Sequence, residues 1–304
     1  MAISRAQLVK ELEPGLNALF GLEYKRYENQ HAEIYTTESS DRAFEEEVML
    51  SGFANANVKA EGSGVEFDEA QETYTARYTH DTIALAFAIT EEAIEDNLYD
   101  RIASRYTKAL ARSMSNAKQV KAVTPLNNGL SSVATFKAGD TVSLFSTNHT
   151  TVSGTAVKNT LTTQADLNET SLEQALIDIA GMTDERGLRV AARGVKMIIP
   201  SANQFNAERL MKSQGRTGTA DNDINAVASM GMIPQGYRVN NFLTDTDSWY
   251  IITDVPNGMK MFQRAALKTA MEGDFDTGNV RYKARERYSF GVSDYRGIFG
   301  VEGA

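Results

Sequence analysis

TEEAIEDNLYDRIASRYTKALARSMSNAKQVKA, residues 90–122, has the most regular pattern in the chain. Apolar side chains recur in it every three or four residues, which predicts one long amphipathic helix. Thr90 is a favourable N-cap, acidic residues fill the first two turns, and Pro125 is expected to end the helix. At 1.5 Å per residue such a helix would be roughly 46 Å long, a long rod for one globular domain.

The two sides of this helix differ in character. The predicted apolar stripe consists of Ile94, Leu98, Ile102, Tyr106, Leu110, Met114 and Ala117. The opposite side carries the bases Arg101, Arg105, Lys108 and Arg112. The stripe is expected to pack against the body of the protein, and the bases are candidates for contact with a partner.

Residues 44–89 are predicted to be extended. Residues 73–80 alternate with a period of two, EGSG at 61–64 marks a turn, and DEAQE at 68–72 is a polar tip. This pattern predicts a long β-hairpin whose strands have too few apolar residues to bury both faces. Such a hairpin needs another surface to lie on. IALAFAI, residues 83–89, is apolar throughout and is expected to run into the core.

The rest of the chain divides into an arm and an α/β unit. Residues 1–43 are mostly polar, and Pro14 with Gly15 is expected to interrupt a short helix there. The α/β unit is predicted from capping patterns, a buried strand, a loop and a hairpin. These features are Ser171 with Gln174, Ser201 with Gln204 before a helix to about Met211, VKMIIP at 195–200, QGRTGTADNDIN at 214–225, and two strands around Pro256-Asn257-Gly258.

The C-terminal segment returns to extended structure with two different faces. Arg281, Lys283, Arg285 and Arg287 alternate with Tyr282, Ala284, Glu286 and Tyr288. Because successive side chains of a strand point to opposite faces, one face is expected to be basic and the other largely aromatic.

Composition excludes several classes of protein. The chain has no cysteine and only three histidines, which excludes disulfides and zinc–thiolate sites and argues against a histidine-rich metal site. The net charge of −9 combines −14 over residues 1–100 with +5 over 101–200 and zero over 201–304. An acidic chain is a poor candidate for tight nonspecific DNA binding. The longest apolar run, 83–89, is too short for a membrane helix, so no membrane partner is expected.

Catalytic patterns are weak in this sequence. It contains no P-loop, GxGxxG, HExxH or GxSxG motif, so no enzyme activity, cofactor or metal is predicted. Ser146 with His149 would need an orienting acid to act as nucleophile and base, and Ser115 with Lys118 is expected to be a pair on a helix surface. The acidic groups 45–47 and 66–69 lack the spacing of a metal-binding loop and are predicted to be solvent or interface charge.

The order of these elements resembles the Hong Kong-type capsid fold, which major capsid proteins of tailed phages share with encapsulins. Three segments are similar to Mu-type major head subunits: EGSGVEFDE at 61–69, FAITEEAIEDNLYDRI at 87–102 and LFSTNH at 144–149. The resemblance implies an α+β fold with four parts. They are an N-terminal arm (1–43), an extended β-hairpin loop (44–86), a peripheral domain with a long spine helix (87–127 and 262–304), and an axial α/β domain (128–261), whose loop at the capsomer centre would be 214–225.

The resemblance also implies a function. The chain would be the major capsid protein of a tailed bacteriophage, assembling in the host cytoplasm into hexamers and pentamers of an icosahedral virion shell around double-stranded DNA. A portal and a separate scaffolding protein are expected as partners, the latter because the hairpin starts close to Met1, and a decoration protein is compatible with this fold. Two alternatives remain: an encapsulin-type cellular shell, and an α/β hydrolase that uses Ser146 and His149.

The charge pattern indicates where subunits would meet. Acids of the hairpin are predicted to contact bases of a neighbouring copy, although each exposed pair would contribute only about 0–1 kcal/mol. The acids are Glu61, Glu66, Asp68, Glu69 and Glu72. The bases are Arg101, Arg105, Lys108 and Arg112 of the helix and Arg281, Lys283, Arg285 and Arg287 of the C-terminal strand.

Overall fold

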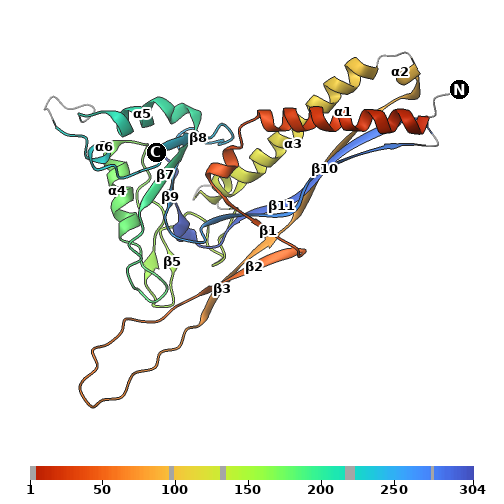
Figure 1. Ribbon diagram of the computed structural model, residues 1–304. Helices are drawn as coiled ribbons and strands as arrows, with labels where there is room; N and C mark the ends of the chain where they lie inside the picture. The colour runs from red at the N-terminus through yellow and green to blue at the C-terminus, as the bar shows by residue number, and fades with distance from the viewer. Residues whose placement is uncertain (1–4, 96–98, 131–134, 216–222, 275–276) are drawn as a thin grey trace.

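Two four-stranded sheets organise the molecule (Figure 1). The computed structural model describes residues 5–95, 99–130, 135–215, 223–274 and 277–304. One sheet is long and carries two long helices on one face, whereas the other is smaller and is surrounded by shorter helices and loops. A narrow hairpin lies against the end of the long sheet at its root and extends past the smaller unit at its tip. This arrangement is the mixed α+β fold expected from the sequence.

The long sheet has the strand order β1-β10-β11-β4. Its strands are β1 (Thr36–Ser39), β10 (Met259–Gly273), β11 (Val280–Val292) and β4 (Asp81–Ile89). β10 and β11 form a long antiparallel ribbon, to which β1 adds in parallel on one side and β4 antiparallel on the other. β4 does not run into the core as expected, because it is the edge strand and six of its nine residues are exposed.

The predicted long helix is α3 (Tyr99–Gly129), preceded by the short α2 (Glu91–Glu95). The Thr90 hydroxyl accepts a bond from the Ala93 amide at 3.4 Å, so Thr90 caps α2, whereas α3 begins at Tyr99. Pro125 does not end the helix. The helix continues for four residues because Leu126 and Leu130 are buried in the main core, which offsets the missing proline amide.

The buried stripe of α3 is partly the predicted one. Leu110 and Met114 are buried as expected, but Tyr106 is 52% exposed. The small residues Ala103 and Ala111 are also buried, because the helix packs against both the sheet and a second helix. The side chains of Ile94, Leu98, Arg101 and Ile102 lie outside the described residues.

That second helix, α1 (Arg5–Arg26), corrects the expectation of an irregular arm. It runs without interruption through Pro14, and its residues Leu16 and Phe20 are buried under α3 and the long sheet. The Asn17 side chain accepts bonds from Tyr282 at 2.8 Å and Thr269 at 2.7 Å. Tertiary contacts of this kind override the local penalty of a proline in a helix.

The smaller sheet has the order β12-β9-β7-β8. Its strands are β7 (Gly194–Ile199), β8 (Tyr237–Val239), β9 (Trp249–Thr253) and β12 (Ile298–Val301). Around it lie α4 (Glu169–Ala180), α5 (Gln204–Lys212), α6 (Ala226–Met230), the short pair β5 (His149–Thr150) and β6 (Ala156–Val157), and the 3-10 turns η1 (Gln30–Glu33), η2 (Ser201–Asn203) and η3 (Tyr295–Gly297). The main hydrophobic core fills this unit and continues under the end of the long sheet.

Three predictions in this part were wrong in detail. β9 and β10 do not form a hairpin, because the Pro256–Gly258 turn carries the chain from the small sheet into the long one. The last strand, β12, pairs with β9, although residues 262–304 were assigned to the peripheral domain. The N-cap of α4 is Asn168, and Ser171 is the N3 partner of its capping box. Most of the predicted loop 214–225 lies outside the described residues.

Candidate inter-subunit interface

The root of the hairpin is anchored on its own chain. It consists of β2 (Phe44–Leu50) and β3 (Glu72–Thr79), which are antiparallel. The Tyr78 ring lies edge-on to Phe262 at 4.8 Å between centroids, and its hydroxyl bonds to Ser293. A side chain at Gly291 would collide with this ring, so the glycine is needed for the close approach. The hairpin was expected to need another surface to lie on. For the root, that surface is the long sheet of the same chain.

Buried polar groups add to this anchor. Lys260 is 7% exposed and pairs with Glu38 at 3.1 Å and with Glu47. Nearby, His80 bonds to Ser40 at 2.8 Å and to Ser289 at 3.0 Å, and Ser40 donates to Glu45. Burial, together with the positive charge of Arg287, lowers the pKa of His80. The root is thus tied to β1, β10 and β11 by buried groups, namely Lys260, His80, Ser40 and Ser289, and by carboxylates that are partly exposed.

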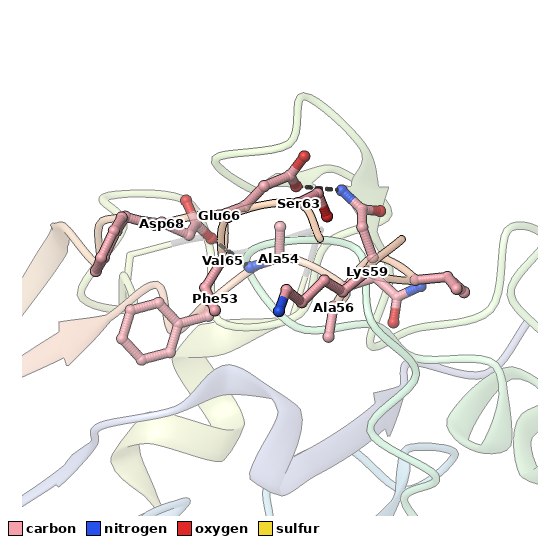
Figure 2. A pocket seen from close by; sticks show the side chains of 13 residues that line it. Phe53, Ala54, Ala56, Lys59, Ser63, Val65, Glu66 and Asp68 are labelled. Atoms are coloured by element: carbon pink, nitrogen blue, oxygen red, sulfur yellow. Dashed lines mark hydrogen bonds between the residues drawn. The ribbon is translucent and has the colours of Figure 1, made fainter. Parts of the chain in front are cut away.

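The loop beyond the root, residues 51–71, has no strand structure. Its two arms are joined by carboxylates: the Ala54 amide donates to Asp68 at 2.7 Å, and Asn57 donates to Glu66 at 2.7 Å (Figure 2). Between the arms is an open hollow. Four large apolar side chains of the loop are at least 61% exposed, namely Phe53, Val58, Val65 and Phe67.

One residue of the smaller unit holds this loop. Arg186 lies 3.7 Å from the Asp68 carboxylate and donates a hydrogen bond to the Glu69 carbonyl. The Ala54 amide, with help from Arg186, lowers the pKa of Asp68. Glu66 and Asp68, predicted to meet a neighbour, therefore already have partners within their own chain. No contact recorded among the described residues involves the carboxylates of the remaining acids, Glu61, Glu69 and Glu72.

The bases of β11 form a continuous row on one face of the long sheet. Arg281, Lys283 and Arg285 are exposed, whereas the alternating Tyr282 and Ala284 are buried, as the sequence predicted. Arg281 pairs with Asp274 of the same ribbon. Arg287, the last base of the row, is half-buried beside the hairpin root.

The same face continues into the hairpin root. Ser289 and Gly291 come after the basic row in β11 and point to the same face. Ser289 lies beneath His80, and Gly291 lies beneath Tyr78. Along the row, β4 presents Ala84, Ala86 and Ala88, all exposed and opposite the bases in register. The hairpin thus covers one end of this face, and the basic remainder is open. We call this remainder, the row with its flanking alanines, the open basic face.

The bases of α3 lie on the other side of the molecule. Arg105, Lys108 and Arg112 are exposed and point away from the buried stripe that contacts the sheet. Glu286 of β11 points to the face opposite the basic row, and it pairs with Lys118 of α3 at 3.2 Å. The helix α3 therefore packs on that opposite face. The structure therefore places the two predicted groups of bases on opposite faces, and one docked segment cannot contact both.

Ser146 and His149, the candidate nucleophile and base, are hydrogen-bonded to other groups and not to each other in the described part of the chain. His149 is fully buried, its two ring nitrogens lie 2.6 Å from Asp140 and 3.2 Å from Asn159, and its ring stacks on Tyr295. Both nitrogens are thus occupied, and Ser146 binds the Asn148 amide instead. His149 therefore packs in the interior and joins Asp140, Asn159 and Tyr295.

Ser115 and Lys118 are not a surface pair, because both face inward. Lys118 is 11% exposed at its side chain and pairs with Glu286, which also accepts a bond from Tyr24 at 3.4 Å. Burial raises the pKa of Glu286 even though Lys118 lowers it. The contact joins α1, α3 and β11 in the interior.

No group of three or more histidine and carboxylate side chains in the described part of the chain is placed to hold a metal ion. No helix among those residues has the length and apolar character to cross a bilayer.

Sequence reasoning missed three residues of this region. Arg186, Lys260 and Glu47 each make contacts with residues far away in the chain. Lys260 is next to a predicted turn and Arg186 is in a charged loop, so nothing local distinguishes them from ordinary surface residues. Glu47 was identified only as part of an acidic group. The period-two pattern of β2 would have placed it on the same face as Glu45.

Comparison with known proteins agrees with this architecture. A family model described as phage capsid protein matches residues 73–301. Solved structures with a similar fold include a virus-like particle from Pyrococcus furiosus, with 10% identity, a TM-score of 0.55 and coverage of 94% of this chain and 98% of that chain. Among curated proteins, no sequence matches.

Two phage particles show the same fold. The procapsid of bacteriophage JBD30 is 13% identical with a TM-score of 0.55, covering 99% of this chain and 77% of that chain. The capsid of Myoviridae phage XM1 is 10% identical with a TM-score of 0.52, covering 89% of both chains. Since the family match extends over well more than half of the sequence, the chain belongs to the phage capsid protein family and is a major capsid protein of a viral head.

Proposed function

We propose that copies of this chain form hexamers and pentamers of an icosahedral shell around double-stranded DNA, without catalysing a reaction. The observation that carries the proposal is the acidic loop 51–71, whose large apolar side chains are exposed and in which the described contacts give the carboxylates of Glu61 and Glu69 no partner. A segment of this kind is costly in a monomer and useful in an assembly. Repetition of the same contact in a symmetric shell multiplies a weak interaction.

The loop of one subunit docks on the open basic face of a neighbour. Two observations favour β11 over α3 as the receiving surface. Lys283 and Arg285 lie on the face that already accepts the hairpin root, so a second hairpin can follow the same surface. The alanines beside them are short and leave the bases accessible. Opposite charge also orients the encounter before contact.

The phage assignment is favoured over an encapsulin-type shell by the family match. Under it, the expected partners are further copies of the chain, a portal, a separate scaffolding protein and in some shells a decoration protein. An acidic subunit suits a DNA container, because negative charge on the wall avoids adhesion to the packaged genome.

Electron microscopy of charge variants tests the docking. Lys283→Glu with Arg285→Glu is expected to leave the subunit folded and to prevent shell formation. The matched control is Arg105→Glu with Lys108→Glu, the same charge change on the opposite face, which is expected to form shells. Normal shells from the β11 variant would refute the docking on this face.

A second variant tests the loop side of the contact. Glu66→Gln with Asp68→Asn keeps the acceptors for Asn57 and Ala54 while removing two charges, so the loop keeps its internal bonds. Its shells are expected to assemble more slowly and with a weaker dependence on salt. Unchanged assembly kinetics over a salt series would show that these charges are not used.

A further inference from the structure

The free edge of β4 is an unprotected strand. Its sheet ends there, and the strand carries no charge and no proline from Thr82 to Ala88. Natural sheets protect exposed edges with charged residues, prolines, bulges or short strands, because unpaired backbone groups recruit other chains. The opposite edge of the same sheet is protected in this way, since β1 has only four residues and the rest of that edge, formed by β10, has two register shifts and the charged residues Arg264, Lys268 and Glu272. An edge with seven consecutive uncharged residues indicates a position that another strand occupies.

The two faces beside this edge have different chemistry. On the open basic face, the alanines of β4 separate the edge from the row of bases on β11. On the helix side, Leu85 is 48% exposed and Phe87 packs against Tyr106, which is itself half-exposed. A strand added at this edge would meet positive charge on one side and apolar groups on the other.

One segment of the chain matches both faces. In GVEFDEA, residues 64–70, Val65 and Phe67 point to one side of an extended chain, and Glu66 and Asp68 point to the other. Val65 is 70% and Phe67 is 97% exposed. No backbone–backbone hydrogen bond is recorded for these seven residues in the described chain. The other arm of the loop, FANANVK at 53–59, has no acidic residue.

We infer that residues 64–70 of one subunit add as a strand to the free edge of β4 in a neighbouring copy. Main-chain bonds supply the pairing, and the alternation of the segment sets which face each side chain meets. Glu66 and Asp68 then face Lys283 and Arg285 across the alanines, two strand spacings or about 10 Å away, which long side chains can span. The inference rests on the proposed docking of the loop and specifies its geometry.

Hydrogen exchange measured by mass spectrometry on dispersed subunits and on assembled shells tests the pairing directly. Amides of residues 81–89 and 64–70 are expected to exchange at least tenfold more slowly in the shell. If residues 81–89 exchange equally fast in both states while Lys283→Glu with Arg285→Glu still blocks assembly, charge docking stands and strand addition is wrong. If that charge variant assembles normally, the docking itself fails.

Paired variants of the full chain test which arm is used. Val65→Ser with Phe67→Ser is expected to abolish shells or reduce them at least tenfold. Phe53→Ser with Val58→Ser removes apolar residues of comparable exposure from the other arm and is expected to assemble normally. Both pairs are exposed, so neither is expected to unfold the subunit, which circular dichroism checks. The reverse result, with only the second pair defective, would assign the added strand to residues 53–59 and overturn the inference.

Discussion

The root and the loop of the hairpin are consecutive in sequence but are held in opposite ways. The root places Tyr78 and His80 in the interior and surrounds Lys260 with two carboxylates. The loop has no large apolar side chain in the interior, and carboxylates tie its arms to each other and to Arg186. The first arrangement fixes the direction in which the hairpin leaves the sheet, and the second leaves its far end able to exchange partners.

This difference separates stability from assembly. Burial of apolar surface contributes most of the stability of a fold, whereas exposed ion pairs contribute little. Changes in the root should therefore be measurable in the isolated subunit. Changes in the loop should appear mainly when subunits meet.

The largest effect is expected at Tyr78. Tyr78→Ala removes a buried ring that packs between Phe262 and Gly291, and it should lower the free energy of unfolding by about 3–5 kcal/mol. Tyr78→Phe, which keeps the ring and loses only the bond to Ser293, should cost about 1 kcal/mol. In the loop, Phe67→Ala should change stability by less than about 0.5 kcal/mol. Urea unfolding of dispersed subunits measures all three, and equal effects at Tyr78 and Phe67 would contradict the comparison.

A smaller effect is expected from acidification of the root. The pKa of His80 is lowered by burial and by Arg287 and Arg264, against the opposing influence of Glu45 and Asp81. An unfolded chain therefore takes up the proton first, near pH 6.5, and stability is lost as the pH falls from there through the lowered folded pKa.

The readout for His80 is local. Amide exchange in β2 and β3 should accelerate between pH 7 and pH 5, while exchange within residues 51–71, corrected for its intrinsic pH dependence, should not. His80→Gln should remove this change. Because burial also lowers the pKa of His31 to about 4, a residual acid sensitivity around α1 and α3 is expected in that variant. A pH response of the root that persists unchanged in His80→Gln would exclude this histidine as its source.

Elements that neighbouring residues specify could be predicted from the sequence. The helix at 99–129 and the alternation of β11 follow from local periodicity, which neighbouring residues fully specify, so both were predictable. The continuation of α1 through Pro14 and the exposure of β4 depend on which distant elements are adjacent. Local patterns carry no such information.

The candidate interface was likewise predictable only in part. Acids in the loop and bases on α3 and β11 could be identified from charge alone. Two facts could be known only from the structure. The bases lie on opposite faces because α3 packs on one face of the sheet, and Asp68 contacts Arg186 because the loop lies near the small unit. Residue types were predictable because they are local properties, whereas their partners were not.

The smallest effect on stability, and the most specific to the loop, is expected at Arg186. Arg186→Ala removes the contact with Asp68 and the bond to the Glu69 carbonyl, which hold the loop near its own small unit. The unfolding midpoint should not change measurably, but thermolysin should cleave within residues 51–71 several-fold faster. Lys59→Ala, which removes an exposed base inside the loop, is the matched control and should be cleaved at the unaltered rate. If both variants are cleaved at the rate of the parent chain, Arg186 does not restrain the loop. Docking of the loop on a neighbour would then not require the loop to leave Arg186 first.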